Sequence, residues 1–433
     1  MVRAADDNAP LAVTRDPAIV AMLAKVDAKD LRSIDTRLVG FGTRNLFSEG
    51  LHSSSRGVFA ARDWLAGQFG DVAKAGGGRL TVNLDTFVQP KTDYIPRAVE
   101  TSSVYATLPG DDPSRGTIVI SSHYDSRNSD GNDATLDAPG ADDNGSGTSA
   151  VLEAARAMAG SHFKSTIVFA CFDGEEQGLF GSGHFAKKLK DAGVRVEANF
   201  NNDIMGASLG HDGERAPSDV RLFSEALPYG AKPSLVNATG TENDAPSREL
   251  ARAAKELGEA YVPSMHVDLI YRADRFLRGG DQESFAAQDF PAIRYVEAHE
   301  NFDHQHQTVR VERGLQYGDL LPYVDFDYVA RVTRLNVAAI ADLALAPAAP
   351  AVKLDARKLG YDSTLLWTAV PGAASYEVVW RQTDEATWTH AKNVGNATTA
   401  TVPLSKDDWL FGIRAVDAAG HRSVASFPAP LTK

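Results

Sequence analysis

The chain has 433 residues, of which 43% are hydrophobic and 23% charged, so it is long enough for one large folded domain and a smaller one. Its 57 acidic and 44 basic residues give a formal net charge of −13, which argues against a nucleic-acid partner and against an anionic membrane surface. No apolar run reaches the length of a membrane-spanning helix, and a single cysteine, Cys171, excludes an intrachain disulfide.

The first 340 residues carry helix and strand patterns in turn. Apolar residues recur at helical spacing over residues 17–40 and 57–74, and residues 81–89 alternate like a half-buried strand. From Gly116 onward, short apolar runs alternate with helical segments; the runs are TIVI, TIVFACF and parts of VEANFNNDIMG and FPAIRYVEAHE. Continuous apolar strands are buried on both faces. We therefore predict an α/β domain with a mostly parallel central sheet flanked by helices.

The composition changes at ALAPAAPAV, an alanine- and proline-rich segment that cannot continue a helix. Beyond it, short alternating segments are separated by turn residues at the spacing of a small β-sandwich. The order of Trp367, the Tyr376 segment and the Phe411 segment resembles a fibronectin type III module. The predicted parts are a large domain over residues 1–343, a linker over 344–352 and an all-β sandwich over 353–433.

Polar side chains that can bind a metal ion follow each predicted parallel strand. They are His123 and Asp125, then Glu175 and Glu176, then Asp203, then the late histidines His299, His304 and His306, with the pair Asp142 and Asp143 at the entrance to a helix. Each motif alone is more often a turn, a helix cap or a solvated surface group. Because the carboxyl ends of parallel strands meet at one edge of a sheet, the groups are expected to converge. Mixed histidine and carboxylate ligands suit zinc better than magnesium or calcium.

Five segments together resemble the dizinc aminopeptidases, a family that includes secreted leucine aminopeptidases and, more distantly, plasma-type glutamate carboxypeptidases. The segments are SSHYDS, PGADDNGSG, DGEEQGLFGS, NNDIMG and HQHQ, and the likeness covers about residues 25–340. The resemblance implies a zinc-exopeptidase fold of the phosphorylase/hydrolase-like type, a zinc peptidase catalytic domain over residues 1–343, two Zn²⁺ ions per chain and peptide substrates.

The resemblance also implies the metal ligands and the groups around them. His123 and Asp203 would bind one zinc ion, and Glu176 and His306 would bind the second. Asp142 would bridge both ions.

Three further features are implied near these ligands. The peptide bond between Asp142 and Asp143 would be cis. Glu175 would act as the general base on a water held between the metals. Asp125 would orient the imidazole of His123.

Two assignments near the end of the domain leave alternatives. His306 is preferred as the last ligand because relatives carry it in a Tyr-His or Gln-His pair, and His304 is the runner-up, with His299 also available. Several relatives have a tyrosine that stabilises the oxyanion where this chain has Gln305, which would have to donate through its amide. Asp281, in GGDQESF, stands where relatives carry a substrate-facing loop, but a helix cap is an equally good interpretation.

The function implied is a metal-dependent aminopeptidase that removes the first residue of peptides. The alternatives are a carboxypeptidase or dipeptidase on the same dizinc site, a single-zinc glutaminyl cyclase, a non-catalytic binding protein on this fold, and a function carried by the C-terminal module. Family habit and the module lead us to expect a secreted or periplasmic protein, although MVRAADDNAP lacks the apolar segment of a signal peptide. The oligomeric state is not readable from the sequence.

Overall fold

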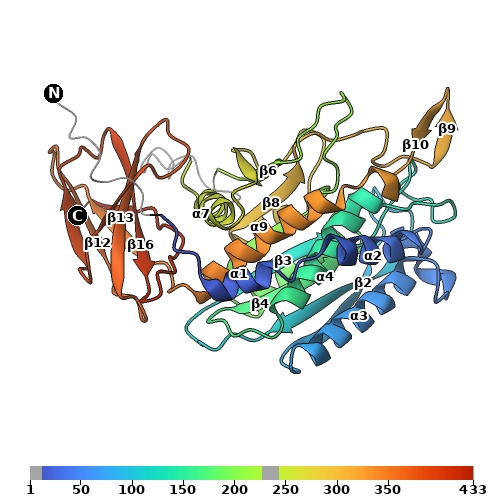
Figure 1. The fold of residues 1–433 in the computed structure, drawn as a ribbon, viewed down its shortest axis with the longest axis horizontal. Helices are drawn as coiled ribbons and strands as arrows, with labels where there is room; N and C mark the ends of the chain where they lie inside the picture. Colours follow the sequence, from blue (N-terminus) through green and yellow to red (C-terminus); the bar gives the residue numbers. More distant parts are fainter. Residues whose placement is uncertain (1–11, 227–242, 433) are drawn as a thin grey trace.

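The computed structural model describes residues 12–226 and 243–432, and its centre is an eight-stranded sheet (Figure 1). The strand order is β1-β2-β4-β3-β5-β8-β6-β7. The four central strands run parallel; they are β4 (Thr166–Phe172), β3 (Thr117–His123), β5 (Val196–Asn202) and β8 (Ala292–Glu297). The mostly parallel sheet predicted from the continuous apolar runs is confirmed.

The outer strands include the antiparallel pairs of the sheet. On one side β1 (Thr81–Gln89) pairs antiparallel with β2 (Val99–Leu108), which pairs antiparallel with β4. On the other side β6 (Asp219–Ser224) is antiparallel to β8, and β7 (His266–Ile270) is parallel to β6. A separate two-stranded hairpin consists of β9 (Arg310–Glu312) and β10 (Leu315–Tyr317).

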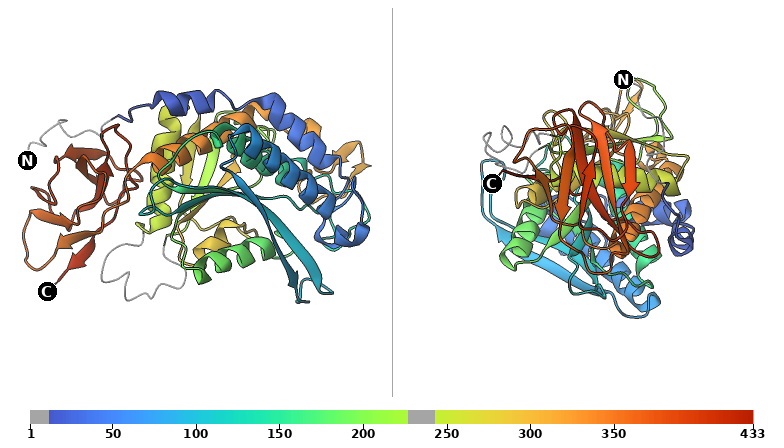
Figure 2. Two further views of the ribbon diagram at one scale, coloured as in Figure 1. Left: turned by 90° about the horizontal axis from the view of Figure 1, so that it is seen from below. Right: turned by 90° about the vertical axis from the view of Figure 1, so that its left-hand side faces the viewer.

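Helices cover both faces of the large sheet, as Figure 2 shows. One face carries α1 (Pro17–Leu23), α2 (Ala28–Val39), α3 (Val58–Ala75), α4 (Gly147–Met158), α7 (Pro246–Tyr261) and α9 (Phe326–Leu345). The opposite face carries α5 (Phe180–Asp191) and α8 (Gln282–Ala286), which pack through a smaller core that includes Phe172, Phe185 and Phe285. Short helical turns lie at η1 (Leu46–Leu51), η2 (Ala141–Ser146) and η3 (Leu321–Tyr323). No helix among the described residues is both long and apolar enough to cross a membrane.

The helical pattern over residues 17–40 forms two helices, with a break at residues 24–27. The side chain of Asp27 accepts a hydrogen bond from the amide of Lys29 at 2.8 Å and so caps α2. Glu153 on α4 accepts the amide hydrogen of Asp27 at 3.1 Å. The N-terminal segment therefore turns where a buried carboxylate of α4 holds it.

The C-terminal residues form two small sheets that pack face to face. The first has the order β15-β12-β11-β17 and the second β14-β13-β16. Their strands are β11 (Val352–Asp355), β12 (Ser363–Trp367), β13 (Ser375–Gln382), β14 (His390–Asn393), β15 (Thr399–Val402), β16 (Trp409–Val416) and β17 (Ala429–Leu431). One buried cluster includes Leu365 and Trp367 from the first sheet and Val378 and Ile413 from the second. The all-β sandwich is confirmed, while the likeness to a fibronectin type III module stays a prediction.

A buried set of charged groups joins the sandwich to α7, which lies beside it in Figure 1. Asp244 accepts hydrogen bonds from Arg252 of α7 at 3.1 Å and from Arg381 of β13 at 2.6 Å. All three side chains are 1–2% exposed. The indole of Trp388 donates to Glu249 of α7 at 2.9 Å. These contacts fix the sandwich against the large domain, and residues 346–351 between α9 and β11 contain no helix or strand.

We expect Asp244→Ala to destabilise the protein by about 3–5 kcal/mol, because two buried guanidinium groups would lose their shared carboxylate. Urea unfolding monitored by tryptophan fluorescence measures the loss, and limited proteolysis within residues 344–352 measures release of the sandwich. Asp355→Ala is the matched control, since Asp355 pairs with Arg357 on the surface of the same sandwich. Equal unfolding curves for the two variants would contradict the role of the buried set.

Candidate metal centre

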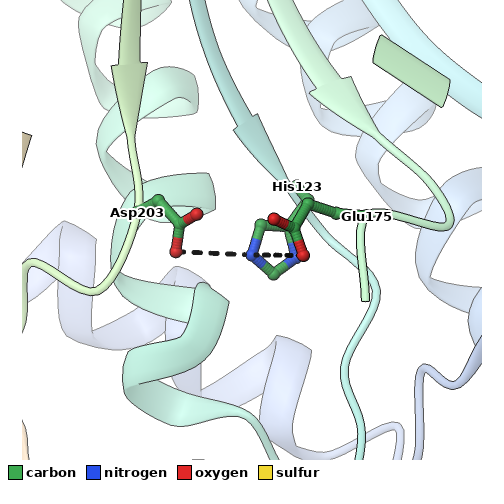
Figure 3. A group of neighbouring side chains, drawn as sticks. All are labelled: His123, Glu175 and Asp203. Atoms are coloured by element: carbon green, nitrogen blue, oxygen red, sulfur yellow. Dashed lines mark ion pairs between the residues drawn. The ribbon is translucent and has the colours of Figure 1, made fainter. Parts of the chain in front are cut away.

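His123 stands at the carboxyl end of β3, beside the ends of β4 and β5. Its Nε2 atom faces three carboxylates: Asp143 Oδ1 at 3.3 Å, Asp203 Oδ1 at 3.5 Å and Glu175 Oε2 at 4.0 Å. Figure 3 shows the imidazole between Asp203 and Glu175. Since the His123 side chain is 1% exposed, these charges interact with little screening by water.

A second group surrounds His306, which lies in the segment between β8 and β9. Its Nε2 atom is 2.9 Å from Asp143 Oδ2 and 2.9 Å from Glu176 Oε2. Asp143 therefore presents one oxygen to His123 and the other to His306. The two groups form one continuous cluster at the carboxyl edge of the parallel strands.

The structure corrects the prediction that Asp142 is the shared carboxylate. Asp142 turns away from the histidines, and its Oδ1 accepts the amide hydrogen of Gly206 at 2.7 Å. The cis peptide bond follows Asp143 and joins it to Asn144, so its predicted place before Asp143 is also wrong. Asp319 accepts the amide hydrogens of Asp142 and Asp143 at 2.8 and 2.7 Å, and in this turn the two side chains point in different directions.

The two neighbouring aspartates also differ in their electrostatics. Burial raises the pKa of Asp142 to about 7. Burial alone would raise the pKa of Asp143 too, but His306 and His123 outweigh it and hold that pKa well below its usual value. Of the two, Asp143 is thus the one kept ionised by the histidines.

Asp125 contacts three residues of the cluster, namely His123, Glu175 and Glu176. Its backbone oxygen lies 3.2 Å and its Oδ1 3.4 Å from Nδ1 of His123, so both atoms can orient the imidazole. Its two carboxylate oxygens also accept the amide hydrogens of Glu175 and Glu176, each at 3.2 Å. Asp125 is fully buried, so it ties the loop after β4 to the end of β3.

Asp203 is held by an arginine that was not among the predicted site residues. Arg294, on β8, donates from Nη2 to Asp203 Oδ2 at 2.8 Å and from Nη1 to Asp274 at 2.7 Å. Burial alone would raise the pKa of Asp203, but Arg294 and His123 lower it. A signal existed, because an arginine inside the apolar strand of FPAIRYVEAHE needs a buried partner. Nothing in the sequence around Asp274 or Asp319 indicated their positions.

Only one of the three late histidines joins the cluster. The ring of His304 stacks on Tyr323 with a centroid distance of 3.6 Å. His299 lies against Asp212 and Glu214 at 3.8 and 3.5 Å, in a more exposed group.

Gln305 does not supply an oxyanion donor in this arrangement. It is 2% exposed, and its Oε1 accepts a hydrogen bond from Arg278 at 2.8 Å. The Nε2 amide has no hydrogen-bond partner among the described residues, and Gln305 does not line the cavity at the cluster.

Asp281 is also placed differently from its predicted role as a substrate contact. It precedes α8 without making a capping hydrogen bond, and it is fully buried. Neither carboxylate oxygen has a hydrogen-bond partner among the described residues. Burial raises its pKa to about 7, and its charge also raises the pKa of Glu175. Asp281 therefore influences the cluster through its charge, and its burial keeps it out of contact with a substrate.

A cavity of about 450 Å³ opens onto the cluster. Its wall includes Asp143, Glu175, Glu176, Asp203 and His306, the exposed apolar side chains of Tyr94 and Leu277, and four arginines, Arg127, Arg275, Arg278 and Arg294. A cavity of this size accommodates a small peptide end.

The cluster has the properties of a site for divalent cations. His123 Nε2, Glu176 Oε1 and Asp203 Oδ1 are buried and have no hydrogen-bond partner within the described ranges. Burial raises the pKa values of Glu175 and Glu176, which their neighbouring carboxylates raise further. Cations between the carboxylates would satisfy these atoms and offset the repulsion. Two imidazoles among carboxylates are a donor set that zinc prefers.

Comparison with known proteins gives relatives over nearly the whole chain. The sequence of residues 103–310 matches the family model of peptidase family M28. A probable zinc metalloprotease of Leptosphaeria maculans is 44% identical over 95% of this chain and 97% of its own length. A probable zinc metalloprotease of Pyrenophora tritici-repentis is 44% identical over 96% of this chain and 87% of its own length.

Solved structures share the fold at low sequence identity. The LapA aminopeptidase of Legionella pneumophila has a TM-score of 0.54 and 21% identity, over 79% of this chain and 78% of its own. A glutaminyl cyclase of Porphyromonas gingivalis has a TM-score of 0.50 and 19% identity, over 73% of this chain and 98% of its own. Both support the predicted fold class of the large domain.

We expect the metal-free protein to release protons when it binds a divalent cation at about pH 8. Burial alone would lower the pKa of His306, but Glu176 and Asp143 outweigh it and raise the pKa to about 10. The imidazole therefore stays protonated at a pH where a free histidine is neutral. Calorimetric titration of Zn²⁺ in buffers of different ionisation enthalpy measures the protons released.

His306→Gln should release fewer protons, while His304→Gln, which changes a histidine outside the cluster, should behave like the parent protein. Binding without proton release in the parent, or an equal reduction in both variants, would contradict this account of His306.

Proposed function

The chain belongs to peptidase family M28, and from that premise we propose that it is a zinc-dependent exopeptidase, an aminopeptidase that hydrolyses the first peptide bond of its substrates. The observation that carries the proposal is the position of Asp143, which reaches His123 with one oxygen and His306 with the other. A carboxylate that reaches two histidine groups can bind two neighbouring metal ions at once.

We assign the ligands from these contacts. His123 and Asp203 would hold one zinc ion, His306 and Glu176 would hold the other, and Asp143 would contact both. When bound, the ions would polarise the scissile carbonyl and lower the pKa of the attacking water. The name of the relatives, probable zinc metalloprotease, supports zinc as the metal.

Glu175 is assigned as the general base. Its Oε2 is 4.0 Å from His123 Nε2, farther than the oxygens of Asp143 and Asp203, and its side chain lines the cavity with 12% exposure. Burial and the neighbouring carboxylates raise its pKa well above the ordinary value, which favours a carboxylate that accepts and returns a proton near neutral pH. Glu175 would take the proton of the attacking water and deliver it to the leaving amine.

We favour an aminopeptidase because the solved structures that share this fold include the LapA aminopeptidase of Legionella pneumophila. A carboxypeptidase or dipeptidase on the same residues is the second candidate, because the cavity wall also carries arginines. The shared carboxylate and the two histidine groups favour catalysis over a binding protein that has lost its ligands. They also favour two metal ions over the single zinc expected of a glutaminyl cyclase.

We expect Glu175→Gln to lower kcat for a leucyl anilide by about 10²- to 10⁴-fold, because the amide cannot accept the proton. Zinc content and the circular dichroism spectrum should stay unchanged, since Asp125 holds the backbone amide of residue 175 and not its side chain. Steady-state kinetics with metal analysis measures both quantities. The N-acetylated anilide should be inert with the parent protein.

Glu312→Gln, an exposed substitution of the same kind on β9, is the matched control. Normal turnover by Glu175→Gln would remove Glu175 as the base. Hydrolysis of N-blocked peptides with a free carboxylate, but not of the anilide, would replace the aminopeptidase by a carboxypeptidase.

A further inference from the structure

Four arginines line the cavity, and two of them are already neutralised. Arg294 contacts Asp203 and Asp274. Arg275 contacts Glu300 at 2.6 Å and Asp274 at 3.2 Å. These two guanidinium groups are therefore part of the framework that supports the cluster.

The other two, Arg127 and Arg278, have no carboxylate within ion-pair distance among residues 12–226 and 243–432. Arg127 donates to the backbone oxygens of Asn128 and Ser129 at 3.2 and 3.4 Å. Arg278 donates to Gln305 Oε1 at 2.8 Å. Both side chains are half-buried in the cavity wall, so each carries an uncompensated positive charge beside the cluster.

Both guanidinium groups are held in place by the surrounding chain. The Cα of Gly131 lies so close to Arg127 that an added Cβ would stand 3.3 Å from its Cζ. The bond from Arg278 to Gln305 joins the loop between β7 and α8 to the residue directly before His306. A side chain fixed in this way loses little freedom when it binds an anion.

The charges on the cavity wall indicate which charged group a substrate carries. Asp143, Glu175, Glu176 and Asp203 face the proposed metal ions, whose charge would balance theirs. The remaining charge on the wall is that of Arg127 and Arg278. A guanidinium group presents paired donors that match a carboxylate better than any neutral group.

Resting on the proposed function, we propose that Arg127 and Arg278 form a carboxylate-binding subsite, so that the preferred substrates carry a carboxylate close to the scissile bond. That carboxylate is either the side chain of an acidic first residue or the free α-carboxylate of a dipeptide. Tyr94 and Leu277, which are exposed on the same wall, would contact the aliphatic part of the substrate.

Two matched substrate pairs test the subsite and distinguish its sources. The first pair is glutamyl and glutaminyl anilide, and the second is leucyl-glycine and its C-terminal amide. In at least one pair the parent protein should favour the carboxylate by about 10- to 100-fold in kcat/KM. Arg127→Gln and Arg278→Gln should each reduce this ratio towards one with unchanged zinc content. Arg331→Gln, on α9 outside the cavity, should keep it, and Arg278→Lys should retain part of it.

The outcomes separate this inference from the proposed function. Hydrolysis that favours the neutral member of both pairs, or a preference that neither arginine variant alters, would overturn the subsite while leaving the peptidase intact. If no substrate is hydrolysed, the proposed function fails. The subsite is then decided by calorimetry on the zinc-loaded protein with two ligand pairs, glutamate against glutamine and leucyl-glycine against its C-terminal amide. Tighter binding of the carboxylate in at least one pair, lost in Arg127→Gln, supports the subsite, and equal binding in both pairs overturns it.

Discussion

The cluster at the carboxyl edge of the sheet depends on the compensation of charge among five carboxylates that lie close together. Asp125, Asp143, Glu175, Glu176 and Asp203 occupy a volume in which burial and mutual repulsion oppose their ionisation. Backbone amides compensate Asp125, the imidazoles of His123 and His306 compensate Asp143, and Arg294 compensates Asp203. Glu176 shares His306 with Asp143, and Glu175 has His123 only at 4.0 Å. Burial still raises the pKa values of both glutamates, so cations bound beside them would relieve the remaining repulsion.

The direction of the parallel strands determines where these carboxylates and histidines meet. β4, β3, β5 and β8 end at the same edge, so groups placed after each strand meet without a long loop. Arg294 points from β8 towards Asp203 of the β5 exit, and Asp319 holds the turn that carries Asp143. Charges from distant parts of the chain thus support Asp203 and Asp143, as is usual where a metal site is built on rigid elements.

The features that follow from periodicity could be predicted from the sequence. The continuous apolar runs predicted the central strands, and the polar groups after them predicted where His123, Glu175, Glu176 and Asp203 would meet. The sequence could not choose between Asp142 and Asp143, because in an irregular turn neither helical nor strand spacing determines which side chain faces the site. The predicted role of Asp281 as a substrate contact was wrong for a related reason. A loop motif does not show whether a carboxylate is buried by the surrounding chain. Contacts made by Asp274 and Asp319 depend on tertiary structure alone.

We propose that Asp143 joins two metal sites. Anomalous diffraction at the zinc absorption edge, from crystals of the zinc-loaded protein, tests it most directly. We expect two peaks, one beside His123 and Asp203 and one beside His306 and Glu176, with an oxygen of Asp143 at each. A single peak, or an Asp142 carboxylate between the ions with Asp143 turned away, would contradict it.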